Sequence, residues 1–262
     1  MDGRLPQRIA LTCYGNAVLS GRQAPKFFPD NSSCSLCASL VFVTQKTQPD
    51  GSKQEITIAD SFERWIDGLR GRGVFGLRLL FLKRMHEWTI EAVRRDSSSE
   101  FWVGDWERLS PVPVAPDRRF FRAVFHYREL CETVNPAHRP LAEVTASLRS
   151  ALREIRAFSE QQHCFSGFTA CFDSALRALD EPQFEPGDYK DLYPADILPI
   201  EGASLLKAGC SASVFGGMGS WSDQFFDDKE TQQEYSRVSG NLSGLLDETI
   251  EVAVGSSMPC QA

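Results

Sequence analysis

The sequence predicts an α+β fold, with a largely antiparallel sheet from the N-terminal half and helices from the C-terminal half packed on it. Two observations support this prediction. Before residue 135, apolar residues alternate with polar ones in several short runs, as in Arg119–Arg128, which is typical of strands with one covered face. After residue 135, apolar residues recur at helical spacing. A run of strands followed by a run of helices is the pattern of the α+β class.

Seven strands are expected in the first half, separated by short turn-forming segments. Gly15-Asn16 is a turn signal that ends the first strand, and the segment Gln48–Ser52 joins the second strand to the third. The breaks between the last four strands are short enough for an antiparallel meander. The expected strands cover residues 8–14, 36–44, 54–59, 74–82, 87–94, 100–107 and 119–128.

One helix is expected inside the β-rich half, because Asp60 and Glu63 have the spacing of a capping box, with Asp60 as the cap. Four more helices are expected in the second half, the third of them ending at Gly209. The first of these begins near Pro140 and the second near Ser166. The third covers about 201–208 and the fourth about 229–254.

Composition bounds the class of protein. The chain has 262 residues, of which 42% are apolar and 24% charged, as in ordinary globular proteins. We expect one domain over 1–262, β-rich over 1–135 and helical over 136–255, with a frayed tail over 256–262. The net charge of −7 argues against a DNA partner, because phosphate contacts need clustered Lys and Arg. No secretory signal and no run of about 18 apolar residues is visible, so a cytoplasmic protein without a membrane partner is expected.

Residues Ser211–Asp223 form the least ordinary stretch of the chain, with three glycines in the four positions 216–219. Glycine adopts positive φ and lets a backbone or a ligand approach closely. One interpretation is a tight turn that places Trp221 in the core. The other is a ligand-facing loop in which Asp223 is a catalytic acid. The residues that would contact a substrate in that loop are Gly216, Gly217, Met218 and Trp221.

The segment Phe215–Asp223, with Leu205-Leu206 before it and Glu234–Ser239 after it, resembles a C-terminal block in a group of uncharacterised, mostly bacterial proteins. Those proteins read F-G-G-M-G-S-W-N-D there, so Ser222 stands in place of an asparagine. The similarity extends to Tyr14-Gly15-Asn16 and to the helices of the second half. No function is known for that group, and the resemblance implies no role for any residue.

Other candidate residues each have a plainer alternative. His126 is either a proton-transfer group, since an imidazole titrates near neutral pH, or a solvent-facing residue in the middle of a strand. Trp102 and Trp106 are an even number of residues apart, so they share a strand face and either line an aromatic pocket or pack in the core. Glu201 begins a helix, where the helix dipole favours a carboxylate.

No metal or cofactor site is expected from the sequence. The four histidines form no His-x-x-x-His pattern. Cys34 and Cys37 have the spacing of a metal or redox pair, but no second pair matches them and they enter an apolar run. Buried free thiols are therefore favoured at both positions.

Two hypotheses for function remain open. The first is a metal-independent enzyme that acts on a small organic or peptide-like substrate in an aromatic-lined pocket, with Asp223, Glu201 and His126 as acid/base groups. Its reaction class stays open between transferase, cyclase and hydrolase. The alternative is a non-catalytic interaction or neutralising module whose acidic surface meets a basic partner. The glycine loop and the long connection over 182–199, which would rim and cover a pocket, narrowly favour the enzyme.

Overall fold

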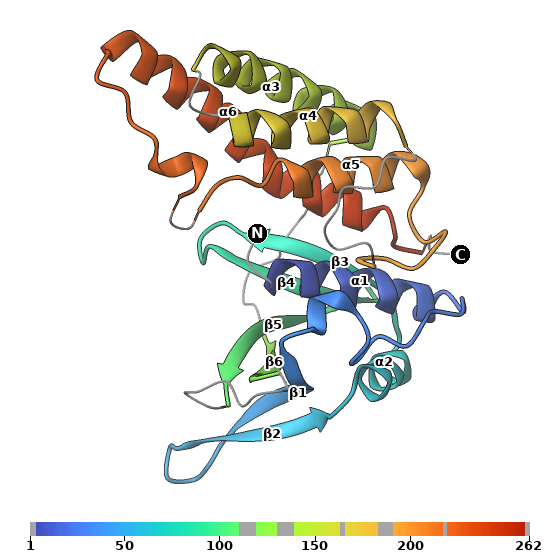
Figure 1. Ribbon diagram of the computed structural model, residues 1–262. Coiled ribbons are helices and arrows are strands. Elements are labelled where there is room, and N and C mark those ends of the chain that lie inside the picture. The colour runs from blue at the N-terminus through green and yellow to red at the C-terminus, as the bar shows by residue number, and fades with distance from the viewer. Residues whose placement is uncertain are drawn as a thin grey trace. The chain divides into compact units, whose positions relative to one another are not determined.

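The computed structural model describes residues 4–109, 119–129, 139–162, 166–182, 191–216 and 219–259, and within them it confirms the α+β class (Figure 1). The strands come from the N-terminal half and most helices from the C-terminal half. The chain divides into two compact units. The sheet unit comprises Asp2–Pro136, Tyr189–Ile197 and Ser257–Ala262, and the helical unit comprises Ala137–Asp188 and Leu198–Ser256. The single domain expected over 1–262 stays a prediction.

The strands have bounds close to those expected, apart from the first expected strand. They are β1 (Cys37–Thr47), β2 (Lys53–Ala59), β3 (Val74–Leu82), β4 (Glu87–Arg94), β5 (Ser99–Arg108) and β6 (Phe121–Arg128). The helices are α1 (Arg4–Leu19), α2 (Phe62–Gly71), α3 (Leu141–Gln161), α4 (Ser166–Asp180), α5 (Ile200–Ser211) and α6 (Lys229–Gly255).

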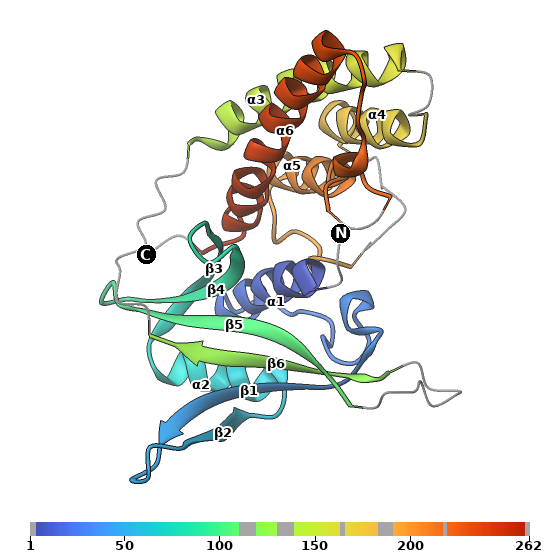
Figure 2. The same ribbon diagram turned by 90° about the vertical axis from the view of Figure 1, so that its left-hand side faces the viewer.

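The six strands form one sheet in the order β2-β1-β6-β5-β4-β3, which Figure 2 shows side by side. Strands β3 to β6 form the expected antiparallel meander, and β1 and β2 form an antiparallel hairpin. The hairpin joins the meander through a parallel pairing of β1 with β6. Because of this pairing, only β1 lies between β2 and β6 in the sheet. A group of residues described below depends on this order.

An aromatic core lies on the sheet face that carries Trp102. The Trp65 ring of α2 stacks on Phe42 of β1 with ring centroids 4.3 Å apart, and Trp102 meets both rings edge-on at 5.7 and 5.8 Å. Trp106, on the same face, donates its indole N–H to Gln7 of α1 at 2.8 Å. Helices α1 and α2 therefore cover the same face of the sheet, and each aromatic pair adds roughly 0.5–1.5 kcal/mol beyond area burial.

Helix α1 corrects the prediction for the start of the chain. Residues 8–14, expected as a strand, lie in this helix, and so do Gly15 and Asn16, expected as a turn. Twelve consecutive residues, Pro6–Ala17, are buried. A helix that is buried on all sides has no polar face, so its sequence lacks the 3.6-residue period that identifies amphipathic helices.

Gly15 and Asn16 attach α1 to β3, which is an edge strand of the sheet. A Cβ at Gly15 would overlap the Leu77 Cδ1 atom, so glycine lets the helix lie directly against the strand. The Asn16 Nδ2 donates to the Leu77 carbonyl at 3.0 Å, and its Oδ1 accepts from the Leu77 N–H at 2.7 Å. The side-chain amide thus satisfies backbone groups that an open edge would offer to another chain.

Two helix ends also differ from the prediction. Ser61, rather than Asp60, caps α2, because the Ser61 Oγ accepts from the Arg64 N–H at 3.2 Å while Asp60 pairs with the Arg64 guanidinium. Helix α5 continues through Gly209, where it was expected to end. A Cβ at Gly209 would lie 2.9 Å from the Thr249 Cγ2, so this glycine permits close packing of α5 on α6.

The end of the chain is anchored in the sheet unit, although a frayed tail was expected from residue 256. Ser257 is buried, and its hydroxyl accepts a hydrogen bond from the Asn16 Nδ2 at 2.7 Å. Met258 lies over Gly76 of β3, where a Cβ would come within 2.9 Å of the Met258 Cγ. Residues 260–262 lie outside the described part of the chain. Among the described helices, none has an apolar stretch long enough to cross a membrane.

In the long connection expected over 182–199, Asp191 is hydrogen-bonded to the segment Asn31-Ser32. Asp191 accepts hydrogen bonds from the Ser32 N–H and, through its carbonyl, from the Asn31 Nδ2, both at 2.7 Å. Residues 183–190 lie outside the described residues, and the expectation of a pocket cover there stays a prediction.

Candidate functional site

Trp221 belongs to the core of the helical unit. Its ring is fully buried and lies edge-on to the rings of Phe168 and Phe172, with centroids 5.4 and 5.3 Å away. The indole N–H donates to the Ser239 Oγ at 2.7 Å, and the Trp221 carbonyl accepts from the Tyr235 hydroxyl at 2.5 Å. The indole has one donor, which Ser239 satisfies, so its burial carries no polar penalty.

Asp223 closes the turn that delivers Trp221. Its Oδ2 accepts from the Gly219 N–H at 2.5 Å and from the Ser220 N–H at 3.1 Å, while the Ser220 Oγ accepts from the Ser222 N–H at 3.2 Å. Gly216 and Gly219 have φ of 86° and 81°, a region that favours glycine. The described part of this stretch therefore has the geometry of a tight turn that places an aromatic ring in the core.

The substrate-binding roles expected in this stretch stay predictions. Gly217 and Met218 lie outside the described residues. Gly216 is exposed, and Trp221 has no exposed surface in the structure. Glu201 lies in the first turn of α5, at the helix start expected from the sequence, and its side chain is exposed.

Phe225 and Phe226 follow the turn and behave in opposite ways. Phe226 packs against Phe158 and Tyr235, with ring centroids 5.6 and 5.5 Å away, and its N–H donates to the Gln232 Oε1 at 2.9 Å. Phe225 is 76% exposed, more than any other large hydrophobic side chain among the described residues. One phenylalanine thus fixes the segment to the core while the next one is presented to solvent.

Acidic residues surround Phe225 in the sequence and dominate the helical unit. The segment Asp223–Glu234 contains five acids and one lysine. Across the whole helical unit there are 17 Asp and Glu against 8 Lys and Arg, a net charge of −9. The rest of the chain has 18 acids against 20 bases, a net charge of +2. The overall charge of −7 is therefore located in one unit.

In the sheet unit, His126 of β6 lies with two glutamates. One ligand-type atom from each of Glu55 of β2, Glu107 of β5 and His126 lies within 4.8 Å of the other two. The register places all three residues on the sheet face opposite Trp102: Val43 pairs with both His126 and Thr57, and Glu107 pairs with Arg122, four residues before His126. Only His126 was expected from the sequence, because the grouping depends on strand pairings that leave no local pattern.

Arg122 joins the two glutamates of this group. Its guanidinium donates to the Glu107 Oε2 at 2.8 Å and to the Glu55 Oε1 at 3.0 Å. Burial by itself lowers the pKa of Arg122, but the bonds to Glu55 and Glu107 outweigh it, so the pKa lies above its ordinary value. The Nδ1 atom of His126 is buried, and among the described residues it has no hydrogen-bond partner.

On the other face, Trp102 is fully buried, whereas Trp106 is half-buried and bonded to Gln7. The Gln7 Nε2 also donates to the sulfurs of Cys34 and Cys37, each at 3.5 Å. Both thiols are buried and unbridged, and burial raises the pKa of Cys34 to about 11 and that of Cys37 to about 12. Thiols with such pKa values are protonated at neutral pH and are poor nucleophiles.

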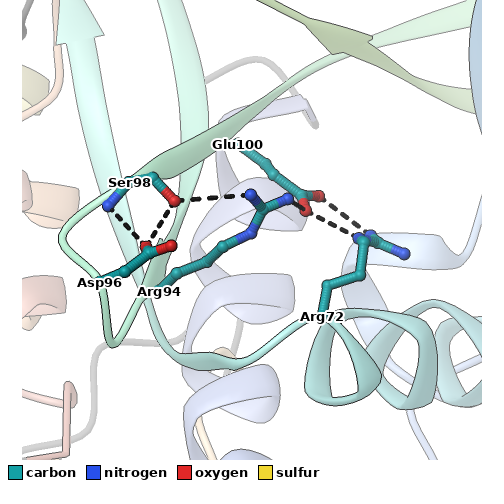
Figure 3. Close-up of polar contacts among 5 residues, drawn as sticks. All are labelled: Arg72, Arg94, Asp96, Ser98 and Glu100. Carbon is teal, nitrogen blue, oxygen red and sulfur yellow. Dashed lines mark hydrogen bonds and ion pairs between the residues drawn. The ribbon is translucent and has the colours of Figure 1, made fainter.

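A second ion network surrounds Glu100 of β5, as Figure 3 shows. The Glu100 Oε1 accepts from the Arg72 Nε at 2.7 Å and from Arg94, and its Oε2 accepts from the Arg72 Nη2 at 2.9 Å. Burial alone raises the pKa of Glu100, but the hydrogen bonds and charges of the two arginines outweigh burial and bring this pKa below its ordinary value. Both carboxylate oxygens have partners, so this network ties α2 to the sheet.

The expected site residues thus fall into separate groups. Trp221 and Asp223 share one turn of the helical unit, while Trp102 and Trp106 lie on the sheet face opposite His126. Comparison of the chain with protein-family models, curated proteins and solved structures finds no significant match.

Proposed function

We propose that this chain is a non-catalytic interaction module, whose helical unit presents an acidic surface to a basic protein, with Phe225 as the aromatic anchor. The observation that carries the proposal is the 76% exposure of Phe225 within the acidic segment Asp223–Glu234. Aromatic side chains contribute much of the binding energy at protein interfaces. Contact of a large aromatic ring with water is unfavourable, and burial of the ring against a partner removes this contact.

The charge distribution supports a basic partner. A net charge of −9 in the helical unit creates a negative potential, which attracts a basic surface, raises the association rate and repels acidic competitors. The sheet unit, at +2, has no comparable field. Nucleic acid, which is itself anionic, is disfavoured by the same charge.

The segment that carries Phe225 is held in place on both sides. Asp223 closes the preceding turn, Phe226 packs on the core, and Asp228 caps α6 by accepting from the Thr231 N–H at 2.8 Å. A surface that is ordered before binding loses less conformational entropy when the partner arrives. Preorganisation of this kind is what an interaction module needs.

The enzyme hypothesis is the second candidate, and one observation favours it. His126 lies close to Glu55 and Glu107, a combination that suits acid/base chemistry. Two of the aromatic residues expected to line its pocket, Trp102 and Trp221, are fully buried, which favours the core alternative for them. The interaction module accounts for the exposed aromatic residue and the charge together, so it is the hypothesis we adopt.

Affinity capture tests the proposal. The wild-type chain and the Phe225→Ser variant are immobilised and used to capture proteins from the cell of origin, and the dissociation constant of each captured protein is measured with purified material. We expect a basic protein whose affinity falls at least about 10-fold in Phe225→Ser, in line with the loss of an interface anchor. Met85→Ser removes another exposed apolar side chain, from the sheet unit, and should leave the affinity unchanged.

Both variants should fold like the wild type, since surface substitutions change stability by about 0.5 kcal/mol or less. Equal binding of the same partner by wild type and Phe225→Ser would remove Phe225 from the interface. A captured partner with an acidic surface would contradict the proposal as a whole.

A further inference from the structure

We infer that Glu55, Glu107 and His126 form a binding site for one divalent transition-metal ion of the zinc class. The three residues come from β2, β5 and β6, and one ligand-type atom of each lies within 4.8 Å of the other two. The centre of a triangle with such sides is at most about 2.8 Å from each corner, so small side-chain shifts reach the zinc–ligand distances of about 2.0–2.2 Å. This inference concerns the sheet unit alone and is independent of the acidic helical surface.

Arg122 holds the two carboxylates for this purpose. It bonds Glu107 through Oε2 and Glu55 through Oε1, which leaves the second oxygen of each carboxylate for another ligand contact. Two carboxylates at this separation repel each other, and the guanidinium offsets that repulsion. Residues that orient metal ligands by hydrogen bonding are common around metal centres and tune the affinity.

His126 supplies the ligand that distinguishes a transition-metal site from an ordinary acidic patch. A neutral imidazole offers one nitrogen lone pair, and the Nδ1 of His126 is buried without a hydrogen-bond partner among the described residues. Burial of an unbonded nitrogen has a desolvation cost, which coordination to a metal removes. The lone pair is therefore more favourable when it binds a metal than when it binds nothing.

The donor set points to the class of ion. One imidazole nitrogen and two carboxylate oxygens suit zinc or a neighbouring first-row ion, whereas calcium and magnesium prefer six or more oxygens. Three protein ligands leave a position for water, which is the arrangement of open rather than structural zinc sites. The positive charge of Arg122 repels the bound metal ion, so we expect micromolar rather than nanomolar affinity for the metal.

The sequence indicated no metal site because its histidines have no helical ligand spacing. The three residues come together through the parallel pairing of β1 with β6, the hairpin of β1 with β2 and the antiparallel pairing of β5 with β6. A site that is built across strands leaves no local pattern in the chain.

Calorimetric titration of zinc chloride into the chelator-treated full chain, with a reductant present, tests the inference. We expect one equivalent to bind with micromolar affinity at about pH 7. Glu107→Gln and His126→Asn should each weaken binding by at least about 10- to 100-fold. Glu107→Gln changes a partly exposed side chain and keeps its shape, so it tests the site even if His126→Asn folds poorly.

Two matched controls separate this site from other ligands. His86→Asn removes an exposed histidine at φ 50°, which asparagine tolerates, and should leave zinc affinity unchanged. Cys34→Ser removes a thiol and should also have no effect. Absence of micromolar binding in the wild type would overturn the inference, and so would binding that survives both site variants or is lost only in Cys34→Ser.

Discussion

At the scale of single residues, most side chains that suggest chemistry in the sequence are used within the fold. Asp223 accepts two backbone N–H bonds, Trp221 donates to Ser239, and Trp106 donates to Gln7. Hydrogen bonds of this kind stabilise the fold. The Nδ1 of His126 and the Nε1 of Trp102 have no hydrogen-bond partner among the described residues, and Phe225, which the sequence did not single out, is exposed. His126 also lies beside two carboxylates and Phe225 lies in an acidic segment, so we propose functions for these two residues.

Glu100 predicts how stability depends on pH. Its pKa is lower in the folded chain than in the unfolded chain, so its contribution is present above the unfolded value of about 4.3 and is lost as the pH falls through the folded value. Glu100→Gln should destabilise the fold by about 1–3 kcal/mol at neutral pH, less than for a fully buried pair because water reaches both arginines. Urea unfolding of the wild type and Glu100→Gln from pH 3 to pH 7 measures the difference in their free energies of unfolding. A difference that does not change with pH would refute the prediction.

Asp223 predicts a contrast between two substitutions. Asp223→Ala removes the acceptor of two backbone bonds and should cost about 0.5–2 kcal/mol, as for other caps. Asp223→Asn keeps an acceptor oxygen and should cost about 0.5 kcal/mol or less. Thermal unfolding of both variants checks the pair. A ligand whose binding is abolished by Asp223→Asn, at unchanged stability, would instead assign Asp223 to a site.

At the scale of elements, glycines decide how closely helices approach their neighbours. Gly15 lets α1 lie on β3, and Gly209 lets α5 lie on α6. The sequence suggested a turn at the first and a helix end at the second. A glycine in the sequence is compatible with both a turn and a close helix contact. Which of the two it forms depends on a neighbouring element that is distant in the chain.

Gly15 and Gly240 give a prediction of opposite signs. Both lie inside helices, where alanine is normally favoured over glycine by about 0.5–1 kcal/mol. At Gly240 a Cβ has no atom within 4 Å, so Gly240→Ala should stabilise by about that amount. At Gly15 it would overlap Leu77, so Gly15→Ala should destabilise by about 1–3 kcal/mol, the range for overpacked cores. Calorimetric melting compares the two, and stabilisation by Gly15→Ala would mean that α1 does not lie against β3.

At the scale of the whole molecule, the sequence predicts the elements that have a local pattern and misses those that depend on contacts between distant segments. The bounds of β3 and β4 match the prediction, because strands and turns there alternate over short distances. Helix α1 was missed because it lacks a polar face, and the parallel pairing of β1 with β6 joins segments far apart in the chain. The grouping of Glu55 with Glu107 and His126 depends on that pairing, so it too was out of reach.

The division of charge is a property of the whole chain that the net value of −7 conceals. The helical unit carries −9 and the remainder +2, so the acidity belongs to the unit that presents Phe225. Charges of one sign on one surface select a partner of the opposite sign. This division is the physical basis of the proposed interaction.

The salt dependence of partner binding tests this account most directly. The dissociation constant of the captured basic protein is measured from low to high salt with the wild-type chain and with Asp227→Lys, which reverses one exposed charge beside Phe226. We predict that the wild-type affinity falls steeply as salt screens the attraction. Asp227→Lys should bind more weakly at low salt and with a shallower salt dependence. Affinity that is independent of salt, or tighter binding by Asp227→Lys, would contradict an acidic surface that recognises a basic partner.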